Sequence, residues 1–394
     1  MMVKPPVFVD QTINQGLKQN LTPDKFTQLV RLITEIRLDC ADINVAAWQE
    51  LRQYPVVPMD NLRGNIEACC RQAALAAQLG FKKVNIAVFA CAQLNTAAVR
   101  LALATAREYG LTAALKIRNA SALSIAQIAE LAEKVSLTAG DTVIYGDEGS
   151  LLDPLHTKDI LTELQGKLSA ELEFCAYNEL GLASANTLAA LHAGIRRVAT
   201  AVGGIDGFAA FEEVLLGNKF LLKVPVSIGG NLAGLSKEAL ACLGRELPAN
   251  KPVIGTAVFA HESGIHVDGV LKNPELYEPF SPHLVGLSRK LVIGKHSGTA
   301  SLRAKLQTWN MPLSDFDAAL LLGMVRNLAV AQKGMVNDRQ LIDLYDEVCG
   351  LTKYDGIEGD EICKAEKKYS SLTLHCGTGN KRRVLFSLPK KSSL

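Results

Sequence analysis

The strongest constraint on the fold is a regular alternation of strand-like and helix-like segments through the first 225 of the 394 residues. Short apolar runs are followed by longer segments whose apolar residues recur at helical spacing. The runs with strand character are residues 7–9, 42–45, 56–59, 84–89, 113–117, 142–145, 172–176 and 197–202. Helices are expected at residues 65–79, 96–109, 124–135, 155–168, 183–192 and 208–216. Eight such units in about 220 residues predict a parallel (βα)8 barrel.

Local signals mark the ends of several of these helices. Thr22 followed by Pro23 predicts a helix start, because Thr is a favourable N-cap and Pro fits the first helical turn. Gly80, Gly110 and Gly194 follow helical segments and predict their C-terminal caps. A doubly wound α/β sheet shares the same local pattern and is the alternative fold. No glycine-rich dinucleotide turn follows the first strand, which favours the barrel.

The rhythm changes after residue 225, where helices are expected at residues 236–243, 313–327 and 338–348. The last 44 residues are rich in Lys and Arg, with strand-like runs at 370–375 and 383–387. A basic segment of this kind is more often a solvated surface than a nucleic-acid site. We therefore expect a barrel domain over 1–225, a helical linker and subdomain over 226–350, and a basic C-terminal segment over 351–394.

Composition and charge exclude several classes of protein. With 48% hydrophobic and 21% charged residues, the chain can bury a large core and is not intrinsically disordered. A net charge of +2 provides no global field for nucleic acid or anionic lipid, and no apolar run reaches the roughly 20 residues that span a bilayer. The nine cysteines form no CxxC pair and indicate reduced thiols, so we expect a cytoplasmic protein with neither nucleic acid nor membrane as partner.

Four motifs carry a resemblance to a known family. They are His261-Glu-Ser-Gly-Ile-His-Val-Asp-Gly269, Leu291-Val-Ile-Gly-Lys-His-Ser-Gly298, Asn178-Glu-Leu-Gly-Leu-Ala-Ser-Ala-Asn-Thr-Leu-Ala-Ala190 and Leu344-Tyr-Asp-Glu-Val-Cys-Gly350. In their order along the chain, within residues 7–350, they resemble the homocitrate synthase / 2-isopropylmalate synthase family, most of all the homocitrate synthases of nitrogen fixation.

The resemblance implies a TIM barrel that condenses acetyl-CoA with a 2-oxo acid, of which 2-oxoglutarate is the one expected here. In this family a divalent metal at the barrel mouth polarises the ketone of the 2-oxo acid as a Lewis acid. An Arg stabilises the developing oxyanion, and a base removes a proton from the acetyl methyl group. A dimer built through the linker region is also implied.

The first-strand motif of the family, Asp-x-Thr-Leu-Arg-Asp-Gly-x-Gln, is only partly matched by residues 10–19. Thr12 is kept and is expected to contact substrate. Asn14 stands where the resemblance places the catalytic Arg, and it lacks the charged guanidinium fork. Gln15 stands at the position of a metal-binding Asp, where a hard cation favours a carboxylate.

The other ligand positions also differ from the family pattern. The seventh-strand His-x-His motif reads Cys175-Ala-Tyr177, so both metal-binding His are replaced. Phe208 falls at the ligand position of a loop after the eighth strand that is about three residues shorter than the family's. One thiol does not make a metal site, and a phenol is protonated at neutral pH. No metal site is therefore expected, and no cofactor.

Three further residues complete the predicted site. Arg118 takes the place of a family acid after the fifth strand, and Glu148 follows the sixth strand, where it is expected to bind substrate. His266 lies in the linker motif, and the resemblance implies that it reaches the active site, usually that of the partner subunit, for proton transfer. The same motif can equally be retained for packing of the linker.

Three hypotheses follow. The first is a non-catalytic or impaired homologue, a homodimer or a heteromer with an active paralogue, whose ligands are acetyl-CoA and a 2-oxo acid. The second is an active carbon–carbon bond enzyme with altered, metal-independent chemistry, which uses Arg118, Glu148, Glu179 and Cys175. The third is an ordinary homocitrate synthase whose metal ligands come from other residues.

Overall fold

The structure, a computed structural model, describes residues 5–50, 58–90, 94–262, 273 and 276–354, with side chains as far as residue 350. The chain divides into two compact units. The first comprises Met1–Val258 and Pro282–Leu287, and the second comprises Phe259–Ser281 and Ser288–Leu394. Each unit is described by itself.

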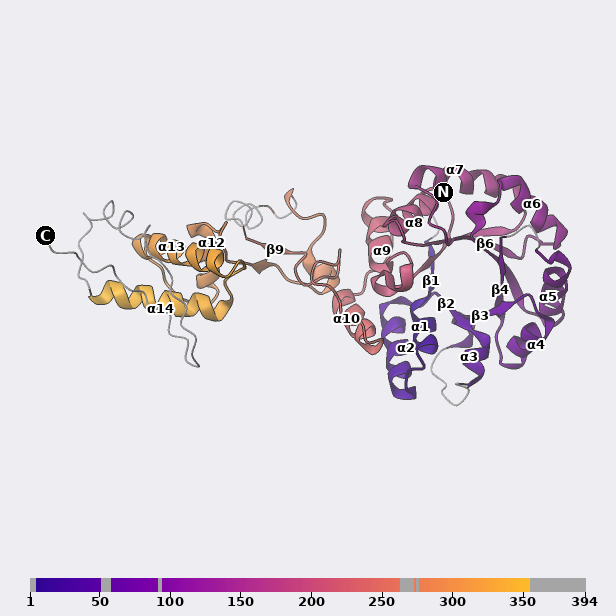
Figure 1. Cartoon of the computed structure of the whole chain (residues 1–394), viewed down its shortest axis with the longest axis horizontal. Helices are drawn as coiled ribbons and strands as arrows, with labels where there is room; N and C mark the ends of the chain where they lie inside the picture. The colour runs from indigo at the N-terminus through magenta and orange to yellow at the C-terminus, as the bar shows by residue number, and fades with distance from the viewer. Residues whose placement is uncertain (1–4, 51–57, 91–93, 263–272, 274–275, 355–394) are drawn as a thin grey trace. The chain divides into compact units, whose positions relative to one another are not determined.

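The first unit is a closed barrel of eight parallel strands in sequential order, β1-β2-β3-β4-β5-β6-β7-β8 (Figure 1). The strands are β1 Val7–Asp10, β2 Cys40–Asn44, β3 Leu62–Glu67, β4 Lys83–Phe89, β5 Thr112–Arg118, β6 Thr142–Asp147, β7 Glu171–Ala176 and β8 Arg197–Thr200. The barrel closes where Val7 of β1 pairs with Arg197 of β8. The predicted (βα)8 fold is confirmed, and the doubly wound alternative is wrong.

Helices surround the strands (Figure 1), and each of them buries apolar residues. They are α1 Thr12–Lys18, α2 Pro23–Arg37, α3 Val45–Glu50, α4 Cys70–Gln78, α5 Thr96–Glu108, α6 Ile125–Lys134, α7 Pro154–Lys167, α8 Ala183–His192, α9 Phe211–Phe220 and α10 Leu232–Cys242. In α2, for example, Phe26, Leu29, Val30 and Ile33 are buried at helical spacing. Because the strands are parallel, their carboxyl ends all lie at one end of the barrel, which we call the mouth.

One expected strand was placed wrongly. Residues 56–59 were expected to form the third strand, but β3 lies at Leu62–Glu67 and residues 59–61 form a short 3-10 helix. The expected helix at 65–79 begins only at Cys70. The reason is that β3 directs polar residues, among them Arg63 and Asn65, into the barrel, so its sequence lacks an apolar stripe.

The helix-end signals were largely correct. Thr22 is the N-cap of α2 with extended backbone, and Pro23 occupies the first helical position, although the Thr22 side chain makes no capping hydrogen bond. Gly80, Gly110 and Gly194 have φ of +88°, +72° and +95°, which is the left-handed region that favours glycine at a helix end.

The first unit extends beyond the expected boundary at residue 225. Helix α10 packs against α2, and the segment Pro282–Leu287 also belongs to this unit. Gly286 shows how closely this segment approaches, since a Cβ there would lie 2.9 Å from the carbonyl oxygen of Gly230. The compact unit therefore runs to Val258 because residues after 225 complete its outer layer.

In the part of the second unit that the structure describes, there are three α-helices and a small sheet. The helices are α12 Thr299–Gln307, α13 Asp315–Ala331 and α14 Asp338–Tyr354, and the strands are β9 Ala260–His261 and β10 Lys290–Leu291. Its core is aliphatic and includes Leu302, Leu321, Val325 and Val348. Two of these helices match the expected ones at 313–327 and 338–348. The basic segment at 351–394 lies almost wholly outside the described residues.

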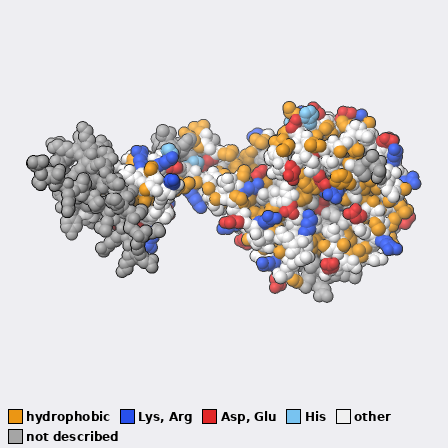
Figure 2. All heavy atoms as spheres, in the orientation of Figure 1, with side chains coloured by type: hydrophobic (Ala, Val, Ile, Leu, Met, Phe, Trp, Pro, Cys, Tyr) orange, Lys and Arg blue, Asp and Glu red, His pale blue; other side chains and the backbone are white. Residues whose placement is uncertain are grey.

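The surface of the barrel unit is mixed in charge. On the face seen in Figure 2, Lys and Arg alternate with Asp and Glu, and no single sign dominates. Among the described residues, no helix is both long enough and apolar enough to cross a membrane.

Candidate active site at the barrel mouth

The carboxyl ends of β7 and β8 carry an apolar cluster at the position where the resemblance places metal ligands. Tyr177 and Phe208 form an isolated antiparallel bridge, and their ring centroids lie 5.1 Å apart. Cys175 is 1% exposed and belongs to the same buried cluster as Phe208. We call Cys175, Tyr177 and Phe208 the aromatic cap. These three predicted positions are therefore brought together, as side chains that fill space.

The aromatic cap disfavours negative charge. Burial raises the pKa of the Cys175 thiol, so the protonated form, which is a poor metal ligand, is favoured. Burial also raises the pKa of the Tyr177 phenol, and the neighbouring Cys175 and Glu148 add to this shift. Both groups are held neutral at physiological pH.

Lys116 and Arg118 of β5 lie beside the aromatic cap, and we call these two residues the basic edge. The Arg118 Nε donates to Glu148 Oε1 at 2.8 Å, and this hydrogen bond raises the pKa of Arg118. The Tyr177 hydroxyl donates to the same Glu148 oxygen at 3.4 Å, and the Lys116 Nζ lies 3.5 Å from the Tyr177 hydroxyl. The predicted residues Arg118 and Glu148 thus meet at the mouth. Lys116, which the sequence reasoning missed, faces the barrel two residues before Arg118.

The three predicted residues of the first-strand motif, Thr12, Asn14 and Gln15, are buried within the protein. Thr12 is fully buried, and its hydroxyl accepts a hydrogen bond from the Val202 amide at 2.9 Å. The Asn14 Oδ1 accepts from the Asn44 amide at 2.9 Å, and Gln15 is 2% exposed. All three lie in α1. Their roles towards a substrate stay predictions.

Asp10, at the end of β1, has a strongly perturbed carboxyl group. Burial raises its pKa to about 6, against the lowering effect of the hydrogen bond it accepts from the Ile13 amide. Such a shift makes Asp10 a candidate proton carrier, since perturbed carboxyl groups cluster at functional sites. Its signal in the sequence was the match at the first position of the family motif.

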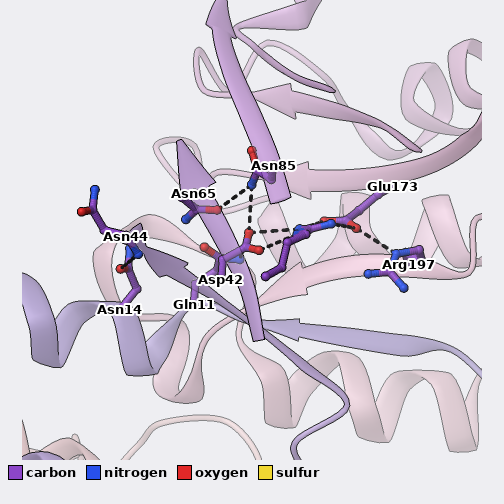
Figure 3. Close-up of polar contacts among 9 residues, drawn as sticks. Gln11, Asn14, Asp42, Asn44, Asn65, Asn85, Glu173 and Arg197 are labelled. Carbon is purple, nitrogen blue, oxygen red and sulfur yellow. Dashed lines mark hydrogen bonds and ion pairs between the residues drawn. The ribbon is translucent and has the colours of Figure 1, made fainter. Parts of the chain in front are cut away.

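Below the mouth, four charged side chains form a buried ion-pair network (Figure 3). Arg63 pairs through Nε with Asp42 at 2.6 Å and through Nη2 with Glu173 at 2.6 Å, and Arg197 pairs with Glu173 at 3.0 Å. We call Asp42, Arg63, Glu173 and Arg197 the ionic layer. Burial opposes ionisation of Asp42, but the charge and hydrogen bonds of Arg63 outweigh it, and the net pKa of Asp42 is lowered. Sequence reasoning missed this layer because its four residues come from four strands.

Amide side chains adjoin the ionic layer (Figure 3). Gln11 donates to Asp42 Oδ2 at 3.0 Å, and Asn85 donates to Asn65 Oδ1 at 2.7 Å. The Oδ1 of Asn85 is buried and has no hydrogen-bond partner among the described residues. This side of the barrel therefore offers neutral polar groups to a ligand.

The residues at the mouth do not fit the divalent metal that the resemblance implies. Among the described residues, no group of three or more His, Cys, Asp or Glu side chains is arranged to hold a metal ion. The positions expected to supply ligands offer an amide, a protonated thiol, a protonated phenol and a phenyl ring. We derive no step through a metal, and a metal-free site stays a prediction.

The linker motifs fall in the second unit. His266 lies outside the described residues. In the other motif, Ser297 Oγ accepts from the Gly294 amide at 3.0 Å, and Glu262 Oε1 accepts from the His296 amide at 3.0 Å. A Cβ at Gly294 would lie 2.5 Å from that Glu262 oxygen, so a side chain there would displace the Glu262 carboxylate. The motif builds a tight loop that precedes α12.

Comparison with known proteins agrees with the two-part architecture. Residues 90–221 match a family described as HMGL-like, and residues 253–333 match one described as "Homocitrate synthase post-HMGL domain-like". Both matched regions are therefore similar to the HMGL-like/homocitrate synthase family. It is 37% identical over 257 residues to 2-isopropylmalate synthase 2 of Caldanaerobacter subterraneus, which covers 64% of this chain and 66% of the relative.

Two other similarities complete the comparison. The homocitrate synthase omega subunit of Clostridium pasteurianum is 27% identical over 352 residues, covering 86% of this chain and 95% of that protein. An HMG-CoA lyase from Acinetobacter baumannii has a TM-score of 0.50 at 17% identity, covering 62% of this chain and 93% of the lyase, which supports the fold alone. The chain spans between 55 and 66% of the length of four curated relatives in the HMGL-like/homocitrate synthase family.

Proposed function

We propose that this chain is a homocitrate synthase-like protein that keeps the barrel of the acyl-CoA condensing enzymes without their metal-dependent condensation. The observation that carries the proposal is the aromatic cap. Tyr177 packs on Phe208 above a buried Cys175, where three metal-ligand positions are expected. A divalent cation needs charged or strongly polar oxygen and nitrogen ligands, and this cluster supplies none in ionised form.

The basic edge supports retained binding of a carboxylate ligand. Lys116 and Arg118 both point to the mouth, and Glu148 neutralises only one of the two charges. Arginine and lysine are the usual partners of carboxylates, and a charge-assisted bond is stronger than a neutral one. A 2-oxo acid, with 2-oxoglutarate first, is therefore the ligand class that we propose, with acetyl-CoA as its companion.

A role within an assembly is part of the proposal. One relative over most of the chain is named the omega subunit of a homocitrate synthase. We propose that this protein is a homodimer, or a regulatory or structural partner of an active paralogue, and that it resides in the cytoplasm. The six described cysteines are free thiols, as a reducing compartment favours.

The test is release of free CoA from acetyl-CoA with 2-oxoglutarate, with and without Mg²⁺ or Mn²⁺. We expect no metal-dependent rate, while an active homocitrate synthase works in the same assay. A clear metal-dependent rate contradicts the proposal. The triple variant Gln15→Asp/Cys175→His/Tyr177→His offers a gain-of-binding control, because it restores the three ligand types. It should bind Mn²⁺ by calorimetry where the wild type does not.

A second candidate is a metal-independent carbon–carbon bond enzyme, and Lys116 is the observation that favours it. Lys116 is half-buried, and its amine lies 3.5 Å from the Tyr177 hydroxyl, whose proton is retained because burial raises the pKa of the phenol. The neutral amine would add to the ketone carbon of a 2-oxo acid, and the carbinolamine would lose water to leave an electrophilic iminium. Cyanoborohydride would reduce this iminium to a secondary amine, so peptide mass spectrometry should find Lys116 heavier by the mass of 2-oxoglutarate less one oxygen atom. An unmodified Lys116 excludes this candidate and leaves the first intact.

A further inference from the structure

A cavity lies at the end of the barrel opposite the mouth, where the strands begin. It has a volume of about 520 Å³ and is lined where β1, β2, β4 and β8 start, at Val7, Cys40, Lys83 and Arg197. Ligand pockets in proteins commonly measure about 300–1,000 Å³. The cavity is therefore large enough for a small organic or inorganic ligand.

The lining of this cavity is strongly basic. Its charged residues are the four cations Arg37, Lys83, Arg196 and Arg197 and the single carboxylate Asp39. These cations come from three segments of the chain, one of which supplies both Arg196 and Arg197, and the barrel closure brings the three segments together around one space. Like charges that share a cavity repel one another, so they favour a bound anion.

Two of the cations already have carboxylate partners. The Arg37 Nε pairs with Asp39 at 2.8 Å, and the Arg197 Nε pairs with the buried Glu173 at 3.0 Å. The other two do not. Lys83 donates to the backbone carbonyl of Asp60 at 2.9 Å, and the nearby Asp60 carboxylate is already paired with Lys82 at 2.6 Å. Arg196 is exposed and has no ion-pair partner among the described residues.

We propose that this cavity at the N-terminal face of the barrel binds a small multivalent anion with two or more carboxylate or phosphate groups. Lys83 and Arg196 supply the unpaired positive charge, and Arg37 and Arg197 contribute their remaining guanidinium N–H groups. Two uncompensated charges around one space favour a divalent or trivalent ligand over chloride. The site is separate from the carboxylate site at the mouth, because the ionic layer fills the barrel between them.

The test is calorimetric titration of the full chain with inorganic pyrophosphate and with citrate, at one ionic strength set with chloride. The wild type should bind at least one of them in the millimolar range or tighter. The variant Lys83→Gln/Arg196→Gln should bind at least about tenfold more weakly, because its two changes remove the unpaired charges. These positions are chosen since loss of Arg197 would also remove one of the two arginine partners of the buried Glu173.

Two controls locate the binding. Arg100→Gln removes an exposed cation of α5 outside the cavity and should leave the affinity unchanged. Arg118→Gln removes a cation of the mouth and should also leave the affinity of this site unchanged. Circular dichroism verifies that each variant is folded. Preference for pyrophosphate identifies phosphate as the ligand group, and preference for citrate identifies carboxylate.

Three results would overturn the inference. The first is no binding of either anion by the wild type. The second is equal binding by the wild type and the Lys83→Gln/Arg196→Gln variant. The third is binding that Arg118→Gln abolishes while the double variant retains it, which would place the anion at the mouth. The proposed function does not depend on any of these outcomes, because its assay measures CoA release.

Discussion

The interior of the barrel has two layers of opposite character along the same strand. In β7, Glu173 belongs to the ionic layer, whereas Cys175 and the adjoining Tyr177 belong to the aromatic cap two and four residues further on. The ionic layer is buried, charged and paired through short contacts. The aromatic cap is neutral and packed by ring contact with Phe208. Charged side chains therefore lie deep in the barrel, whereas the three residues of the aromatic cap at the mouth are uncharged.

This difference separates what the fold needs from what a reaction needs. A buried carboxylate without a partner is expensive, so Asp42 and Glu173 require Arg63 for the barrel to be stable. At the mouth, a metal site would keep polar side chains aimed at a ligand, whereas apolar side chains there contribute only packing. The mouth of β7 and β8 therefore has the character of a core. We infer that the barrel is maintained for stability and binding.

The largest expected loss of stability is that of Arg63→Met, because Arg63 is the cation that Asp42 and Glu173 share. Asp42 and Glu173 would then be buried carboxylates, and only Glu173 would keep an arginine partner. Breaking a buried pair costs about 3–5 kcal/mol, so we expect a loss of about 4 kcal/mol in unfolding free energy by urea denaturation. Arg100→Met on the exposed face of α5 should change it by less than about 0.5 kcal/mol.

A compensating variant sharpens this first prediction. Asp42→Asn removes one of the two carboxylates that depend on Arg63, so the pair Arg63→Met/Asp42→Asn should be more stable than Arg63→Met alone. Non-additive free energies of this kind are expected for residues in one network. If the double variant lost the sum of both single losses, the ionic layer would not act as a unit.

Phe208→Ala tests the aromatic cap, with a somewhat smaller expected effect. Phe208 is 7% exposed, and removing a buried ring costs about 3–5 kcal/mol through lost burial and a residual cavity. We expect a loss of about 3 kcal/mol by urea denaturation. Phe208→Leu is the matched control and should keep most of that stability. A loss below about 1 kcal/mol for the alanine variant would mean that the cap is a loosely packed site rather than core.

The third test is the pH dependence of stability that Asp10 causes. Its sign is opposite to that expected for Asp42, because burial raises the pKa of Asp10 whereas Arg63 lowers the pKa of Asp42. Burial raises the pKa of Asp10 from 3.8 to about 6, so the folded state holds its proton more tightly than the unfolded state. Its favourable contribution is complete below pH 3.8 and is lost as pH rises to about 6. The difference in stability between wild type and Asp10→Asn should shift by no more than about 3 kcal/mol across this window.

Urea denaturation at several pH values measures that difference. Above pH 6 the wild type should have lost stability relative to Asp10→Asn, and below pH 4 the two should differ by a constant. Glu212, whose pKa burial also raises to about 6, provides a second carboxyl group, which accepts a hydrogen bond from the Gly203 amide in the loop after β8. A flat difference for Asp10→Asn across the whole range would show that Asp10 titrates normally.

The barrel could be predicted from the sequence because its signals are local. Strand β7 reads Glu-Leu-Glu-Phe-Cys-Ala, and α5 has apolar residues at helical spacing with Asn95 as a capping residue. Strand β3 was misplaced because its inward positions carry Arg63 and Asn65, which only the closed barrel satisfies. Polar residues buried by partners from distant strands have no signature in a single segment.

The site could be predicted only in part. The contact between Tyr177 and Phe208 joins the segments that follow two different strands, and the sequence indicated only that each residue departs from a family pattern. Arg118 and Glu148 were expected at the mouth, and they meet there because β5 and β6 are neighbours. Lys116 was missed because an inward-facing lysine has no motif. The ionic layer and the basic cavity at the other face depend on barrel closure and could not be inferred from spacing.

The smallest expected stability effect is at the basic edge. In Arg118→Gln the Glu148 ion pair is lost, but the Arg118 side chain is 48% exposed, and an exposed pair contributes less than about 1 kcal/mol. The effect on ligand binding should be larger. If Arg118 holds a carboxylate at the mouth, the variant should bind 2-oxoglutarate about tenfold more weakly in a calorimetric titration.

Lys167→Gln is the matched control for this last change. Its side chain is 47% exposed and pairs with Glu163 on the outside of α7, so it has a similar ion pair at a distance from the mouth. Both variants should have nearly unchanged stability, and only Arg118→Gln should lose affinity for 2-oxoglutarate. Equal affinities in the two variants would remove Arg118 from the binding site. The basic edge would then be as inert as the aromatic cap beside it.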